Sequence, residues 1–90
     1  MARIPPPPED RHPALIILGA AIRERRKALE LSQEAFADAC GIDRSYMGGV
    51  ERGERNLALI NIMKIIAALD IQPSEFFKAL DKPAARGRKS

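Results

Sequence analysis

The chain contains 90 residues, of which 46% are hydrophobic, and it carries a formal net charge of +3. A chain of this length forms one small domain that buries only about 60–65% of its unfolded surface, so contact with a second copy would add useful burial. The charge favours an anionic partner, although a charge of this size is also ordinary for solubility. One tyrosine, three phenylalanines and no tryptophan argue against an aromatic stacking platform for RNA or single strands.

The cellular compartment follows from what the sequence lacks. Cys40 is the one cysteine and cannot form an internal disulfide, so we interpret it as a small buried hydrophobe in a reducing cytoplasm. No run approaches the roughly 18 apolar residues of a membrane span, and the stretch 1–8 lacks the apolar centre of a signal peptide. We expect a soluble cytoplasmic protein with no membrane partner.

Residues 1–12 are predicted to form a proline-rich arm ahead of a domain at 13–80. Four successive prolines and then Glu9–His12 favour an extended arm, and an uninformative tail is favoured over a proline-motif ligand. Pro13 suits the first turn of a helix. The apolar stripe expected for this first helix contains Leu15, Leu18, Ile22 and Leu29, with Arg26 among them.

The second predicted helix is short and has a clear start and stop. Ser32 is expected to cap its N-terminus, with Gln33 and Glu34 in the opening turn. Gly41 is expected to end it in the left-handed conformation, with Ile42 as the hydrophobic contact of that cap. Its predicted buried stripe consists of Ala35, Phe36, Ala39 and Cys40.

The third predicted helix follows directly, capped by Asp43 and running to about Arg52 before Gly53. Met47 and Val50 are expected to face the core, whereas Arg44, Ser45 and the Gly48–Gly49 side face outward. Each glycine costs a helix roughly 1 kcal/mol relative to alanine. Either another surface approaches this helix closely or packing holds a poor helix in place.

Two further helices are predicted before a basic tail at 81–90, which is expected to be disordered. Residues 58–70 carry an apolar stripe that Ile60 and Ile65 widen, so this helix is expected to be buried on two sides. Its stripe consists of Leu59, Ile62, Met63, Ile66 and Leu69. After Pro73, Ser74 with Glu75 is expected to open a final helix carrying Phe76, Phe77 and Leu80.

The pair of short helices joined by a glycine turn is typical of a helix-turn-helix protein. The span from about Leu18 to Leu80 resembles the Cro/C1-type (XRE) helix-turn-helix family of phage repressors and bacterial regulators. Within it, the stretch 43–57 most resembles the controller proteins of restriction-modification systems. The resemblance implies an all-α, compact five-helix bundle of the lambda-repressor-like type. It also implies a transcriptional regulator that binds duplex DNA sequence-specifically as a homodimer on a palindromic operator.

The residues that would contact DNA follow from this resemblance. Arg44 in the first turn of the recognition helix can donate two bonds to guanine and is the first candidate for base contact, with Ser45 beside it. Candidates for backbone contact are Gln33, Tyr46, Arg52, Arg55 and Asn56. For these residues a second interpretation stays open: Gln33 as a capping residue, Tyr46 as a ring packed between helices, and the loop residues Arg52, Arg55 and Asn56 as a solvated loop.

Two further sets have structural roles. Arg26 and Glu51 match a structural ion pair of the phage repressors, whereas Arg25 departs from the family's leucine and would be exposed or would contact phosphate. The predicted dimer interface is an apolar set on the last two helices, favoured over closure of the monomer core. It consists of Ile60, Phe76, Phe77 and Leu80. Such a dimer would bind half-sites about one helical turn apart.

Other functional classes receive less support. No metal-ligand cluster, glycine-rich phosphate loop or paired catalytic acids accompany the sole histidine, His12, so an enzyme, a cofactor and a small-molecule ligand are not expected. The remaining alternative is an antitoxin or adaptor that uses the same fold to bind another protein.

Overall fold

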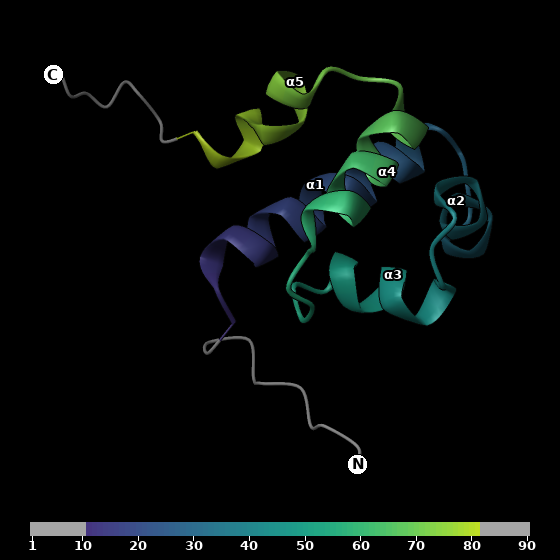
Figure 1. The fold of residues 1–90 in the computed structure, drawn as a ribbon, viewed down its shortest axis with the longest axis horizontal. Helices are drawn as coiled ribbons and strands as arrows, with labels where there is room; N and C mark the ends of the chain where they lie inside the picture. Colours follow the sequence, from purple (N-terminus) through teal and green to yellow (C-terminus); the bar gives the residue numbers. More distant parts are fainter. Residues whose placement is uncertain (1–10, 82–90) are drawn as a thin grey trace, which may run out of the picture.

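The computed structural model describes residues 11–81, and within them all regular secondary structure is helical (Figure 1). Its elements are α1 (Pro13–Ala28), α2 (Gln33–Cys40), α3 (Arg44–Glu51), α4 (Leu59–Leu69), α5 (Pro73–Phe77) and the short 3-10 helix η2 (Lys78–Leu80). The predicted all-α fold with five α-helices is therefore confirmed. The prolines of the predicted arm and all but the first residue of the predicted tail lie outside the described residues.

Side-chain caps fix where α2 and α3 begin. The hydroxyl of Ser32 accepts from the backbone N–H of Ala35 at 3.0 Å, and the carboxylate of Asp43 accepts from the N–H groups of Ser45 and Tyr46. Both caps agree with the sequence analysis. Ser74 does not start α5: that helix begins at Pro73, because proline's fixed φ suits the first helical position without a side-chain cap.

The turn between α2 and α3 depends on Gly41. This residue has φ +71°, a left-handed conformation that costs glycine nothing. The N–H of Ile42 then reaches back to the carbonyl of Ala37 at 2.9 Å and closes the end of α2. The two helices of the helix-turn-helix are thereby fixed relative to each other.

The core lies where all five α-helices meet, and it differs in part from the predicted stripes. Its fully buried side chains are Phe36, Phe76, Ile22, Met47, Ile65 and Val50. In α2, Ala37 is buried whereas Ala35 and Ala39 are exposed, because alanine on a short helix does not define which face is apolar. Leu29 lies past the end of α1 and is 48% exposed.

The prediction that the fourth helix is buried on two sides is wrong for this single chain. Ile65 and Ile66 of α4 face the core, but Leu59 and Ile60 are 66% and 67% exposed. Met63 is exposed as well. One side of α4 is therefore apolar and uncovered.

The position of α3 is set by close packing against α1. A Cβ atom on Gly19 would lie 2.3 Å from the carbonyl oxygen of Val50, so the backbones approach closely only because residue 19 has no side chain. In Figure 1, α3 lies along the lower edge of the described fold and α5 at the upper edge. In this view α3 and α5 are thus on opposite sides of the domain.

Candidate nucleic-acid interface

The exposed side of α3 carries the residues expected to contact DNA. Met47 and Val50 are buried against the core, whereas Arg44 and Ser45 are exposed in the first turn. Because Asp43 satisfies two backbone N–H groups of this turn, the helix start is well formed. The geometry presents one arginine and one hydroxyl side by side on a rigid element.

A buried ion pair holds α3 to α1. The Nε of Arg26 donates to Glu51 at 2.8 Å and its Nη2 donates to the other carboxylate oxygen at 3.0 Å. The third nitrogen, Nη1, donates to the carbonyl of Leu31 at 2.9 Å. The side chains are only 10% and 3% exposed. The hydrogen bond with Glu51 raises the pKa of Arg26 above its ordinary value, so the guanidinium stays charged.

Gln33 connects this ion pair to the exposed surface. Its amide nitrogen donates to Glu51 at 3.0 Å, and its amide oxygen accepts from Nη1 of Arg44 at 3.1 Å. The sequence left open whether Gln33 is only a capping residue. The cap is Ser32, whereas the side chain of Gln33, at the start of α2, bonds to two residues of α3. A continuous chain of hydrogen bonds therefore joins Arg26 to Arg44.

Both the hydroxyl and the ring of Tyr46 make contacts. Its hydroxyl donates to the carbonyl of Asn56 at 3.4 Å, and its half-buried ring packs against the core. The guanidinium carbon of Arg55 lies 5.7 Å from the centre of the same ring. Tyr46 thus connects the loop after α3 to α3 itself.

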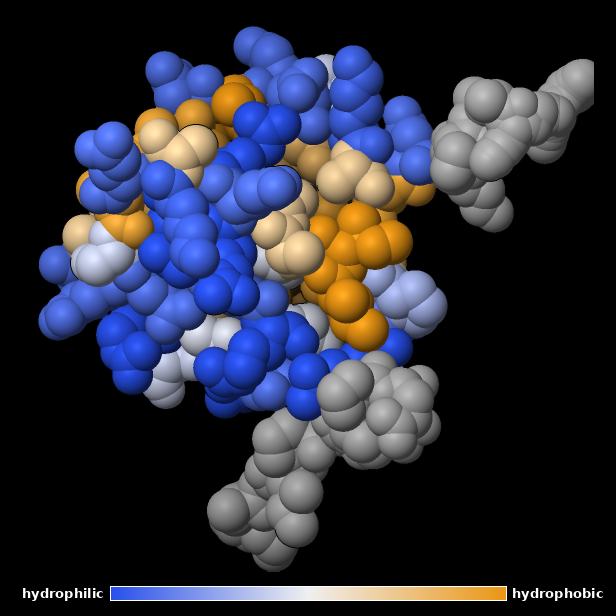
Figure 2. Space-filling view, turned by 180° about the vertical axis from the view of Figure 1, so that it is seen from behind, coloured by the Kyte–Doolittle hydropathy of each residue, from blue (hydrophilic) through white to orange (hydrophobic). Residues whose placement is uncertain are grey.

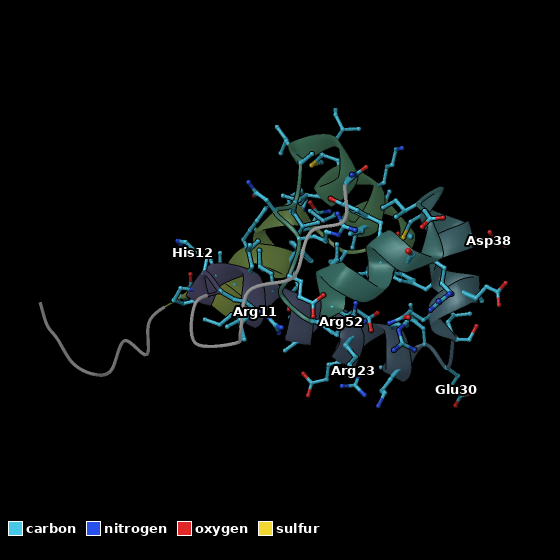
Figure 3. The ribbon with its side chains drawn as sticks, turned by 90° about the horizontal axis from the view of Figure 1, so that it is seen from below. Arg11, His12, Arg23, Glu30, Asp38 and Arg52 are labelled. Carbon is cyan, nitrogen blue, oxygen red and sulfur yellow. The ribbon has the colours of Figure 1, made fainter. Side chains whose placement is uncertain are left out.

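Glu54 organises the start of that loop. Its carboxylate accepts from Arg52 at 2.9 and 3.2 Å, and it pairs with Arg11 at 3.2 Å. Arg11 also donates to the backbone carbonyl of Arg52 at 3.0 Å, and both residues are labelled in Figure 3. The hydrogen bond from Arg52 lowers the pKa of Glu54. Neither Arg11 nor Glu54 was singled out by sequence, since nothing in the pattern predicts a contact over more than 40 residues.

The two glycines of α3 do not leave an open surface, contrary to the expectation that this side faces outward. Both are buried. A Cβ on Gly48 would lie 3.2 Å from Nη1 of Arg52, and one on Gly49 would lie 2.7 Å from Cγ of Arg55. Long side chains of the same chain cover them, so the surface that approaches α3 includes its own arginines.

Two other sequence expectations are resolved by neighbouring side chains. Arg25 donates to Glu75 at 3.0 Å across α1 and α5, in a pair that is 36% and 48% exposed. His12 caps α1, because its Nδ1 accepts from the N–H of Ala14 at 3.0 Å. A polar residue directly before a proline at a helix start is the signal that could have revealed this cap.

The predicted dimer set is only partly available on the surface. Phe76 is 1% exposed because it fills the monomer core, so its assignment to an interface is wrong. Phe77 is half-buried, with its ring edge-on to Phe76, whereas Leu80 and Ile60 are exposed. Figure 2 shows a hydrophobic area on the face opposite to that of Figure 1, beside the points where the described chain begins and ends.

Comparison with known proteins identifies the family. A family model described as Helix-turn-helix matches residues 22–76. The chain belongs to the helix-turn-helix family. The family is one of transcriptional regulators, which confirms the prediction that the chain is not an enzyme. Among the described residues, no helix is both long and apolar enough to cross a bilayer.

The relatives of this helix-turn-helix protein include several controller proteins. It is 43% identical over 58 residues to control protein C.MunI of Mycoplasma sp., covering 64% of this chain and 78% of the relative. It is 39% identical over 61 residues to control protein C.BamHI of Bacillus amyloliquefaciens, covering 67% and 75%. The predicted resemblance to controller proteins is confirmed.

Solved structures agree. The restriction-modification controller protein C.AhdI from Aeromonas hydrophila is 53% identical, with a TM-score of 0.70 over 73% of this chain and 100% of that one. The C.Esp1396I tetramer in complex with its natural 35-base-pair operator is 29% identical, with a TM-score of 0.70 over 77% and 91%. The chain is a helix-turn-helix regulator of the restriction-modification controller type.

Proposed function

We propose that this protein binds duplex DNA sequence-specifically in the cytoplasm and regulates transcription, with α3 in the major groove. The observation that carries the proposal is the exposed first turn of α3. There Arg44 and Ser45 project from a helix that a cap at one end and a buried ion pair at the other hold in place. Arginine donates two hydrogen bonds to O6 and N7 of guanine, which makes Arg44 the main base contact and Ser45 a secondary one.

Contacts to the DNA backbone come from the residues around this turn. Gln33 contributes its amide at the start of α2, where free backbone N–H groups also favour a phosphate. The loop after α3 contributes the exposed side chains of Arg55 and Asn56, and Arg52 contributes its guanidinium at the end of the helix. Tyr46 contributes its hydroxyl, which in the free protein donates to the carbonyl of Asn56.

The protein acts as a homodimer on an inverted repeat. An uncovered apolar side of α4 supports this proposal, because Leu59, Ile60 and Met63 lie exposed together on a small domain. Phe77 and Leu80 extend the interface on the last helices. A two-fold dimer places two α3 helices about 34 Å apart and predicts half-sites about one helical turn apart.

The organisation of the whole chain is part of the same proposal. Residues 13–80 form the domain that binds DNA and dimerises, between an arm at 1–12 and a basic tail at 81–90. Control of the genes of a restriction-modification system is supported by the controller proteins among its relatives. No cofactor or small-molecule ligand takes part, and dimerisation links occupancy to protein concentration.

Selection of duplexes from a random library by the purified protein, at near-physiological salt, tests this function. We expect an enriched inverted repeat. Arg44→Ala should then lose roughly 1–3 kcal/mol on the selected duplex and relax preference at one base position per half-site. Arg55→Ala should weaken all duplexes together and reduce the salt dependence. Equal effects of both variants on every duplex would contradict this division of roles.

The dimer requires its own measurement. Ile60→Glu places a charge on a residue that is 67% exposed in the single chain, so the fold itself has room for it. Sedimentation should show a dimer for the unaltered protein and a monomer for the variant. If the unaltered protein sediments as a monomer and selects no duplex, the exposed side of α4 serves another protein, as in the adaptor interpretation.

A further inference from the structure

Gly49 lies beneath the side chain of Arg55. A Cβ atom at residue 49 would be 2.7 Å from Cγ, 3.1 Å from Nε and 3.4 Å from Cδ of that arginine. The first of these distances is shorter than real Cβ contacts allow. Because Cγ is close to the backbone of residue 55, a small movement at the far end of the side chain cannot relieve the contact, and the whole side chain would have to adopt another rotamer.

The far end of the same arginine lies over Tyr46. Its guanidinium carbon is 5.7 Å from the ring centre, within the range of a cation–π contact. The ring itself is fixed, because Tyr46 packs against the core and its hydroxyl donates to the carbonyl of Asn56. The stem of Arg55 is therefore held by Gly49 and its charged end by Tyr46.

A glycine inside a helix normally reduces stability relative to alanine. Gly49 is buried in an eight-residue helix, so helix formation alone does not explain it. The methyl group of an alanine at this position would enter the space that the side chain of Arg55 occupies. Gly48 differs, since the atoms nearest to its Cβ position are Nη1 of Arg52 at 3.2 Å and Oε1 of Gln33 at 3.4 Å. Both are far ends of flexible side chains that can shift by a few tenths of an ångström.

We propose that Gly49 is a positioning residue for DNA binding: its missing side chain lets Arg55 lie across α3 and hold its guanidinium over Tyr46, ready to contact the DNA backbone. The inference rests on the proposed function. The ordering of Arg55 occurs in the free protein, so binding does not have to immobilise a side chain with many rotamers. This role explains why a glycine occupies residue 49 although glycine destabilises a helix.

The experiment is a double-mutant cycle on the full chain. The unaltered protein, Gly49→Ala, Arg55→Ala and the double variant are titrated with the selected duplex at several salt concentrations. Ordering of one long side chain corresponds to roughly a 2- to 10-fold change in affinity per protomer, which is the loss expected for Gly49→Ala. Its thermal unfolding should be unchanged or shifted upward. In the Arg55→Ala background, Gly49→Ala should have no further effect on affinity.

Gly48→Ala is the matched control, because it adds the same methyl group one residue away without meeting Arg55. Its methyl group meets Arg52 and Gln33, which are themselves proposed to contact the DNA backbone, so any change in its affinity should be the same with and without Arg55→Ala. Additive losses from Gly49→Ala and Arg55→Ala would overturn the proposal, because the methyl group would then act through something other than Arg55. An unchanged affinity for Gly49→Ala would overturn it as well.

A readout without DNA separates this inference from the proposed function. Tyr46 is the one tyrosine and the chain has no tryptophan, so the ring protons of this residue can be followed by NMR in the free protein. Gly49→Ala and Arg55→Ala should shift these signals in the same direction, whereas Gly48→Ala should not. If Gly49→Ala and Arg55→Ala shift the Tyr46 signals alike but the protein selects no duplex, the proposed DNA binding is refuted and the contact between Arg55 and Tyr46 is retained. Selection with an unshifted Tyr46 in Gly49→Ala would refute the contact alone.

Discussion

Removing one partner of the Arg26–Glu51 pair should destabilise the protein far more than removing a surface pair. In Arg26→Met, the carboxylate of Glu51 stays 3% exposed and loses the two hydrogen bonds from Arg26, keeping only the one from Gln33. An uncompensated buried charge of this kind costs roughly 3–5 kcal/mol. The total stability of a domain is about 5–15 kcal/mol. The variant is therefore expected near the limit of folding.

Thermal and urea unfolding followed by circular dichroism measures this cost. Since about 1 kcal/mol corresponds to 4–8 °C for a domain of this size, Tm should fall by roughly 12 °C or more. Glu75→Ala is the matched control, because it breaks the pair of Arg25 with a carboxylate that is 48% exposed and should cost about 0–1 kcal/mol. Replacing both buried partners, as in Arg26→Met with Glu51→Leu, should recover more than half of the loss. Similar losses for Arg26→Met and Glu75→Ala would refute the assignment of a buried structural pair.

Three further predictions follow from other contacts. Gly19→Ala should destabilise the fold by about 1–3 kcal/mol in urea unfolding, because the new Cβ meets backbone oxygen of α3 that cannot move aside; a neutral result would contradict this packing. Burial raises the pKa of Cys40 to about 11, so alkylation by iodoacetamide at pH 8 should occur only as fast as the protein opens, and rapid labelling of the native state would be inconsistent with this burial. The pKa of Glu54 is lowered in the folded state, so its pair with Arg52 stabilises the protein above the ordinary carboxylate pKa, and this stabilisation is lost as the pH falls. The difference in stability between the unaltered protein and Glu54→Gln should therefore vanish in acid. A difference that stays constant with pH would exclude this linkage.

Local signals in the sequence were enough for the helix boundaries around the turn between α2 and α3. Ser32 and Asp43 predicted two helix starts and Gly41 predicted the turn, because each acts on its own backbone neighbours. The family resemblance supplied the rest of the fold. Which apolar residues face the core was less predictable. Phe76 and Ile60 are both large apolar residues that the sequence assigned to the same interface, yet Phe76 is buried and Ile60 is 67% exposed.

Contacts between distant residues were the part that could not be predicted. Arg25 and Glu75 are separated by 50 positions and meet only because α5 packs near α1. Arg11 meets Glu54 for a similar reason, since the start of α1 lies beside the loop after α3. A single charged residue carries no information about such partners, so sequence could offer only exposure or phosphate contact for Arg25.

The hydrogen-bonded chain from Arg26 to Arg44 links stability of the scaffold to the surface proposed to contact bases. Glu51 accepts from Gln33, and Gln33 in turn accepts from Arg44, so a change at the buried pair also alters the support of an exposed arginine. Arg44 is thereby oriented in the free protein. In the proposed complex, its hydrogen bond to Gln33 is exchanged when the guanidinium turns to guanine. The same logic applies to Arg55 over Gly49 and Tyr46. In both cases a long, flexible cation contacts an uncharged side chain on α2 or α3, which reduces the entropy lost on binding.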